Sequence, residues 1–154
     1  MKQLIAALLL TLGATAALAA DVGDVLPAFE LKTASDDKVV LGDAVQRIYA
    51  TVDRKADEQL AEALKAPGQA ALDARQAVVI ADISKAPFFV KGIIKSSLEE
   101  RSYVTWVDTR GKTRGHLPFR ADQVTVLDID KRKITAIRYL GSAEGLAAEF
   151  APEE

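Results

Sequence analysis

The chain has 154 residues, with 20 lysines and arginines against 22 aspartates and glutamates, one histidine and no cysteine. The lack of cysteine excludes disulfides, a thiolate nucleophile and a thiolate metal site, and a single histidine leaves little room for a histidine-rich metal site or a catalytic triad. We therefore expect no metal and no cofactor, and the net charge of −2 gives no reason to expect nucleic acid as a partner.

Residues 1–19 have the pattern of a secretory signal peptide. Lys2 supplies one positive charge, Leu4 to Leu12 is an apolar run, and Ala17-Leu18-Ala19 is a small-residue cleavage site. The run is shorter than the ~20 apolar residues that span a bilayer, although an uncleaved anchor or a buried core helix would have a similar composition. We predict cleavage after this site, export to the periplasm, and no transmembrane anchor once the signal is removed.

The expected mature chain, residues 20–154, begins at Ala20 or Asp21 and has the size of one domain. Its net charge is −3, because Lys2 is the only charge removed and 19 bases remain against 22 acids. No repeat, low-complexity stretch or linker divides it. We predict a single domain that buries a core without disulfides.

The sequence pattern of the first half of this domain predicts a hairpin followed by a strand and a helix. In order, the segments are a strand over 25–31, a turn over 33–38, a strand over 39–41, a strand over 46–53 and a helix over 56–66. Asp53 is placed to cap the helix, and Pro67-Gly68 is expected to end it.

The second half alternates strands with helices and then ends in a strand pair and a helix. The segments are strands over 77–83, 103–107, 112–119, 124–129 and 134–140, helices over 88–100 and 143–150, and a hairpin turn over 108–111. Alternating strands and helices require right-handed crossovers and a mostly parallel centre, which the later antiparallel pair turns into a mixed sheet. The predicted fold class is α/β, with a mixed central sheet flanked by helices and an N-terminal β-hairpin extension.

A family resemblance supports this fold. Residues 22–31, Val-Gly-Asp-Val-Leu-Pro-Ala-Phe-Glu-Leu, with Lys38 to Leu41 after them, resemble the G-x-x-x-P-x-F-x-L opening of peroxiredoxin-like and TlpA-like thioredoxin-fold proteins. The remainder is similar to the YtfJ-like group of secreted thioredoxin-fold proteins, mainly at Asp82-Ile83-Ser84 and Gln123 to Leu127. The resemblance implies a thioredoxin-like fold over the whole mature chain but carries no defined activity.

The same resemblance shows which chemistry is missing. Redox-active members place a cysteine where the first central strand meets the next helix, because the helix N-terminus stabilises a thiolate; Thr51 to Ala56 occupy that place here. A second hallmark, a cis-proline before the third central strand, is implied at Arg101 to Val104 and is also absent. Thiol–disulfide exchange and cysteine-based peroxidase activity are excluded for this chain.

The vestigial redox site remains a candidate binding groove. Its expected residues are Asp53, Arg54, Lys55, Arg101, Ser102 and Tyr103. Backbone N–H groups at the helix start favour an anion or a carboxylate, and an extended peptide can pair there without a cysteine. The simpler interpretation is that Asp53 caps the helix and that the two neighbouring bases are solvated. We predict a protein or peptide partner in the periplasm.

Two further interpretations stay open. One is an enzyme with non-thiol chemistry built around Asp53, Arg54, Tyr103 and His116, although the acids nearest His116 in the sequence have no metal-ligand spacing. The other is a structural or stress-related protein without a tight partner. No pair of acids stands out as a general acid and base.

Basic residues gather in the last third of the chain, where residues 101–140 hold nine bases and four acids. The candidate basic face consists of Arg110, Lys112, Arg114, Lys131, Arg132 and Lys133. Lysine and arginine at hairpin tips commonly protect sheet edges against aggregation. The alternative is that these residues form an electropositive face that binds an acidic protein or an anionic lipid surface.

Overall fold

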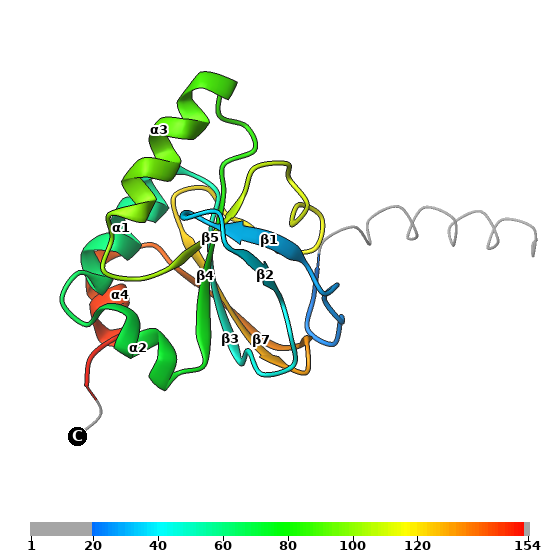
Figure 1. The fold of residues 1–154 in the computed structure, drawn as a ribbon. Helices are drawn as coiled ribbons and strands as arrows, with labels where there is room; N and C mark the ends of the chain where they lie inside the picture. The colour runs from blue at the N-terminus through cyan, green and yellow to red at the C-terminus, as the bar shows by residue number, and fades with distance from the viewer. Residues whose placement is uncertain (1–19, 153–154) are drawn as a thin grey trace, which may run out of the picture.

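The computed structural model describes residues 20–152, so the predicted signal peptide lies outside the described residues. Within this range, seven strands form one sheet and four helices pack on it (Figure 1). In chain order the elements are β1 (Glu30–Thr33), β2 (Lys38–Val40), β3 (Arg47–Thr51), α1 (Arg54–Leu64), α2 (Gly68–Ala74), β4 (Ala77–Asp82), α3 (Phe88–Glu99), β5 (Thr105–Asp108), β6 (Val124–Asp130), β7 (Lys133–Leu140) and α4 (Ala143–Glu149).

The sheet has the strand order β2-β1-β5-β4-β3-β6-β7. Its centre is parallel, because β4 pairs in parallel with both β3 and β5. The β1–β2 hairpin joins β5 antiparallel, and the β6–β7 pair joins β3 antiparallel. This confirms the predicted mixed α/β sheet with its N-terminal hairpin. The parallel pairing also brings the C-terminal ends of β3, β4 and β5 to one edge of the sheet, where the candidate site lies.

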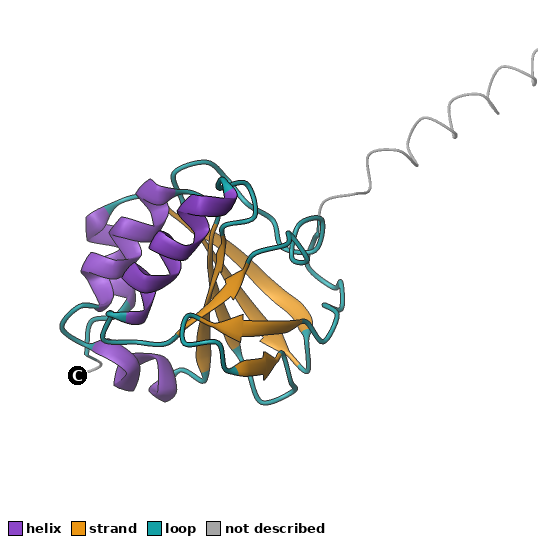
Figure 2. Cartoon of the chain, turned by 45° about the horizontal axis from the view of Figure 1, so that its top comes forward, coloured by secondary structure: helices purple, strands orange, loops and turns teal. Residues whose placement is uncertain are grey.

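All four helices lie on one face of the sheet (Figure 2). Alternate strand residues such as Tyr49, Val79 and Val126 point to this face and are buried. They pack against Leu60 of α1 and Leu146 of α4, among others. Helix α3 covers the neighbouring area over β4 and β5 through Leu98, which packs on the cluster containing Ala81 and Val107. Among the helices within residues 20–152, none is long and apolar enough to cross a membrane.

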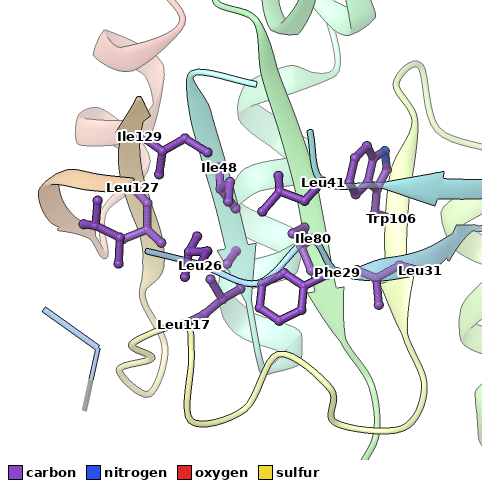
Figure 3. Close-up of a cluster of buried hydrophobic side chains, with 12 residues drawn as sticks. Leu26, Phe29, Leu31, Leu41, Ile48, Ile80, Trp106, Leu117, Leu127 and Ile129 are labelled. Carbon is purple, nitrogen blue, oxygen red and sulfur yellow. The ribbon is translucent and has the colours of Figure 1, made fainter. Parts of the chain in front are cut away.

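The opposite face of the sheet is covered by loops instead of helices. Ile48, Ile80 and Leu127 project from the central strands into this second core (Figure 3). Side chains from the segment before β1 and from the β5–β6 connection close it, including Leu26, Phe29 and Leu117. The chain therefore passes from β5 to β6 across this face.

That crossing corrects the predicted strand over 112–119 and the hairpin turn before it. The buried Asp108 carboxylate accepts the backbone N–H groups of residues 110–113 at 2.8–3.2 Å and the hydroxyl of Thr113 at 2.6 Å, which curls the chain. Both edges of β5 are already paired, with β1 and with β4. A returning strand therefore has no edge to join, and residues 109–123 form a loop.

Three smaller differences from the sequence prediction concern element boundaries. Proline and glycine end α1 as predicted, but Pro67 then stands at the N-cap of α2, a short helix that the sequence analysis missed. The predicted strand over 25–31 becomes regular only at Glu30, because the preceding residues contact β7 through a single bridge between Val25 and Lys133. The third central strand begins at Thr105, two residues after the predicted start.

Candidate binding groove

Asp53 lies between β3 and α1, at the position where the sequence resemblance implies a redox cysteine. It caps α1 as predicted, with one carboxylate oxygen accepting the N–H of Ala56 at 2.9 Å. The other oxygen accepts the N–H of Asp122 at 2.7 Å, in the segment just before β6. Asp53 therefore joins the start of α1 to the neighbouring loop. Both carboxylate oxygens and the Asp122 amide are thus engaged in contacts within the domain.

The strand order explains why Asp122 occupies this position. The sequence analysis expected residues 101–103 across from the start of α1. Of these, Arg101 lines the same groove as Asp53, whereas Ser102 and Tyr103 do not. Those residues precede β5, which lies beyond β4, whereas the strand on the other side of β3 is β6. The segment that faces Asp53 is therefore the one that precedes β6.

The three predicted basic residues near this edge differ in role. Arg54 is exposed and pairs with Glu58 at 2.7 Å one turn along the helix, and Lys55 is exposed. Arg101 binds Asp57 through two hydrogen bonds of 2.8 and 2.7 Å. These bonds raise the pKa of Arg101, outweighing the effect of burial. Arg101 thus anchors the segment after α3 to the first turn of α1.

Ser102 and Tyr103 have structural contacts and line a separate hollow of about 210 Å³. The Ser102 hydroxyl lies 3.3 and 3.2 Å from the backbone oxygens of Leu64 and Lys65, at the far end of α1. Tyr103 is buried, and Arg101 donates to its hydroxyl oxygen at 3.1 Å. Burial raises the pKa of Tyr103, against the lowering effect of the nearby guanidinium. The phenol is therefore neutral at ordinary pH.

A groove of about 480 Å³ lies between α1, α3 and the C-terminal ends of β3 and β4. Asp53, Arg54 and Arg101 line it, so the structure brings together three of the six predicted groove residues. Its apolar lining comes mainly from α3 and the strand ends: Val52, Ala81, Ile83, Val90, Ile93 and Ile94. Charged residues line it both on the α1 side and at the end of β4, where Asp82 and Lys85 contribute. The groove therefore combines an apolar lining with charged residues on two sides.

Exposed apolar side chains extend this surface along α3. Phe88 is 90% exposed, Phe89 76% and Ile93 69%, whereas Leu98 alone of this helix is buried. The sequence analysis predicted a helix over 88–100 but did not distinguish its exposed apolar residues from its buried one. Large exposed apolar patches on soluble domains commonly mark interaction sites. We call Phe88, Phe89 and Ile93 the α3 surface.

The proposed enzyme residues do not assemble. Asp53 and Arg54 line the groove, but Tyr103 and His116 do not. His116 lies on the 109–123 loop and makes an edge-to-face contact with Phe29, whose ring packs in the core on the face opposite the helices. No observation places these four side chains around a common substrate.

The candidate basic face separates into two groups at opposite ends of the sheet. Arg110, Lys112 and Arg114 follow the C-terminal end of β5. Residues 131–133 form the β6–β7 turn, next to the N-terminal end of β3, because Asp128 of β6 pairs with Arg47 of β3.

Three of these bases also have partners within the domain. Lys112 donates to the backbone oxygen of Glu30 at 3.2 Å. Arg114 lies 2.8 Å from the buried carboxylate of Asp82, and Arg132 donates to the backbone oxygen of Leu26 at 2.9 Å. The six predicted residues therefore do not form one continuous face.

A partly buried charge cluster was not anticipated from the sequence. Glu149 of α4 accepts hydrogen bonds from Arg47, Tyr49 and Arg138 at 2.8–2.9 Å. Burial would raise the pKa of Glu149, but the hydrogen bonds from Arg138 and Tyr49 lower it. Arg47 also binds Asp128 at 2.6 Å. The cluster fixes α4 against the sheet, near the N-terminal end of β3.

No protein-family model matches the sequence, and neither does any curated protein sequence. The fold does match solved structures. A protein assigned as a thiol:disulfide interchange protein DsbE from Chlorobium tepidum matches with TM-score 0.59 and 18% identity, over 85% of this chain and 96% of that one. Peroxidoxin BcpB from Mycobacterium tuberculosis matches with TM-score 0.56 and 12% identity, over 85% and 96%.

A protein assigned as a disulfide isomerase from Bacteroides thetaiotaomicron matches with TM-score 0.54 and 13% identity, over 85% of this chain and 86% of that one. Identities this low establish the fold alone. The chain therefore has a thioredoxin-like fold, and it has this fold without any cysteine.

Proposed function

We propose that this chain is an exported, cysteine-free protein of the YtfJ-like kind that binds an apolar segment of a partner protein in the periplasm. The α3 surface carries the proposal. Two phenylalanines and an isoleucine, each at least two-thirds exposed, lie beside an apolar groove. Aromatic side chains are enriched at protein interfaces, and nothing in residues 20–152 covers these three.

The thioredoxin-like scaffold is consistent with a binding role. Thiol chemistry is unavailable to a chain without cysteine, and the polar groups at the former redox edge are satisfied within the domain, as Asp53 and Asp122 illustrate. What remains accessible there is the apolar groove. Burial of apolar surface is the main driving force of association, so the groove and the α3 surface supply binding energy without a catalytic group.

In-cell crosslinking of the tagged protein, followed by mass spectrometry, tests this function. We compare the natural chain with the triple variant F88S/F89S/I93S. The matched control is V22S/V25S, which removes two exposed valines far along the chain from α3. The proposal expects one reproducible protein that is lost from the triple variant and retained by the control. Equal capture by all three chains contradicts it.

Export is tested separately by sequencing the N-terminus of the protein recovered from the periplasmic fraction. We expect the mature chain to begin at Ala20 or Asp21. Recovery of the protein in the cytoplasmic fraction with Met1 or Lys2 at its N-terminus would contradict export, without bearing on the groove.

A further inference from the structure

A second hollow, of about 450 Å³, lies on the other side of α3, above the β1–β2 hairpin. Its floor is the helix-side face of the hairpin, because Lys32 pairs with Val107, and Val107 packs under α3. No helix within residues 20–152 covers β1 and β2 there. Lys95 of α3 and residues 109–112 of the loop after β5 form its walls.

Basic side chains from four separate segments converge on this hollow. They are Lys32 of β1, Lys38 of β2, Lys95 of α3, and Arg110 and Lys112 of the loop after β5. Three acids also line it, namely Glu30, Asp36 and Asp108. The hollow therefore carries a net positive charge, although the whole chain is negative.

The acids do not balance the bases of the hollow. Glu30 is exposed on the same face as Lys32 and forms no ion pair among the described residues, and the other two acids are engaged within the domain. Asp108 is buried and accepts four backbone N–H groups and a hydroxyl, and Asp36 pairs with Lys95. No ion pair among the described residues involves Lys32, Lys38 or Arg110.

Two of these bases also repel each other. Lys32 and Lys38 stand directly opposite each other on paired strands. Like charges in that relation destabilise a hairpin. An anionic group seated between them would relieve the repulsion.

Strand β2 offers backbone groups next to these charges. It is the outermost strand of the sheet. Asp37 and Leu41 form hydrogen bonds with β1 through their backbones, so the alternation of an antiparallel pair directs the backbone N–H and C=O groups of Lys38 and Val40 away from β1. These groups have the arrangement that an added strand uses. Lysines on an edge strand can simply block such pairing, but here four of the five bases come from elements other than the edge.

We propose that this hollow binds an extended acidic peptide segment, which adds to the outer edge of β2 and directs its carboxylates toward Lys32, Lys38 and Arg110. Residues along an added strand alternate between the two faces of the sheet, so every second side chain faces the bases. Val40, 53% exposed on the same face, adds an apolar contact. Backbone pairing supplies register, and charge complementarity supplies the preference for acidic sequences. The site is separate from the groove, since it lies on the opposite side of α3.

The test uses synthetic peptides and the folded mature chain. The probe is a short acetylated peptide that alternates valine and glutamate. A peptide with lysine in place of glutamate keeps the backbone and reverses the charge. A third peptide keeps the glutamates but carries N-methyl groups on alternate amides, which removes strand pairing. The readouts are fluorescence anisotropy for affinity and NMR shifts of the Lys38 and Val40 amides.

We expect only the first peptide to bind tightly and to shift the β2 amides. K38E should weaken its binding by about tenfold or more, the equivalent of ~1.4 kcal/mol. The same change should raise the thermal stability of the domain, because an acid then faces Lys32. Loss of binding together with a gain in stability cannot result from unfolding. K131E, in the β6–β7 turn at the other end of the sheet, is the matched control and should bind normally.

Equal binding of the glutamate and lysine peptides overturns the proposal, as does unchanged affinity in K38E. Full binding of the N-methylated peptide overturns strand addition and leaves only nonspecific charge attraction. The triple variant F88S/F89S/I93S should bind the acidic peptide normally, so failure of this site and failure of the groove are distinguishable.

Discussion

The carboxylate of Asp53 accepts the backbone N–H of Asp122 at 2.7 Å, while its other oxygen caps α1. One side chain thus joins the first turn of α1 to the segment before β6. In this chain, the start of α1 is therefore a structural junction. The proposed binding surface lies beside this junction, along α3.

Asp53→Ala should therefore lower the free energy of unfolding by about 1–2 kcal/mol, because it removes a helix cap and a second hydrogen bond. Asp53→Ser should lose less, since a hydroxyl can cap the helix but is too short to replace both contacts. Urea denaturation measures both. Asp122→Gly is the control, because it keeps the N–H and tolerates the φ of +64° at this residue. An unchanged midpoint in Asp53→Ala would contradict the role of this junction.

Arg101 and Asp57 form the second anchor of this region. The side chains are 17% and 19% exposed and share two hydrogen bonds. Arg101→Lys keeps the charge but loses the bidentate pairing with Asp57. It should therefore lower the free energy of unfolding by about 1–2 kcal/mol. Arg101→Ala should cost more, because Asp57 then loses its partner.

The measurement for Arg101 is again the urea midpoint, combined with partner capture under conditions where the variants remain folded. If Arg101 is structural, capture by folded Arg101→Lys is normal. Reduced capture at unchanged stability would instead make Arg101 a direct partner contact.

Residues of α3 should differ sharply in their effect on stability. Ile93→Ser, at a position 69% exposed, should change stability by less than about 0.5 kcal/mol. Leu98→Ala, at a position 2% exposed, should cost about 2–5 kcal/mol by leaving a cavity. Thermal denaturation of the two variants gives the comparison. A large loss in Ile93→Ser would mean that the outer side of α3 contributes to the fold.

We predict that the domain loses stability in acid as Glu149 becomes protonated. Its pKa is lowered in the folded state by hydrogen bonds from Arg138 and Tyr49, despite burial. A lowered folded-state pKa means that its contribution is fully present above the ordinary value of 4.5 and is lost as the pH falls through the folded-state pKa.

Glu149→Gln should lower stability at neutral pH by about 2–4 kcal/mol, because Arg47 and Arg138 lose a shared anion. It should also flatten the decline in stability below the ordinary carboxyl pKa. The control Glu62→Gln, at an exposed position on α1, should keep the natural pH profile. If the stability of Glu149→Gln falls as steeply with decreasing pH as that of the natural chain, the pH dependence comes from other carboxylates. Asp108, whose pKa is also lowered, is one of them.

The parts of this fold that local patterns encode could be predicted from the sequence. The α1 cap at Asp53 and its apolar face at Ala56, Leu60 and Leu64 follow from spacing within one helix, and the structure confirms them. The alternation of strands and helices likewise predicted the parallel centre. The strand predicted from the local pattern over 112–119 is wrong. The Asp108 carboxylate accepts hydrogen bonds from the backbone amides that follow it, and β5 has no free edge for a returning strand to join.

The candidate site depended on relations that local patterns do not carry. Asp53 and Asp122 are 69 residues apart, and Arg47 and Glu149 are 102 apart. The sequence pattern predicted a helix over 88–100 but could not tell which of its apolar residues the sheet would cover. Which residues are covered depends on where α3 crosses β4 and β5. This crossing leaves the outer part of α3 exposed.

Residue-specific photo-crosslinking in the cell tests the central claim most directly. A photoreactive amino acid replaces Phe89 on the α3 surface or, as a control, Thr135, an exposed residue of β7. Our account predicts a single discrete adduct from position 89, abolished when Phe88 and Ile93 are also changed to serine, and none from position 135. Equal adducts at both positions, or none at position 89, would contradict a binding surface on α3.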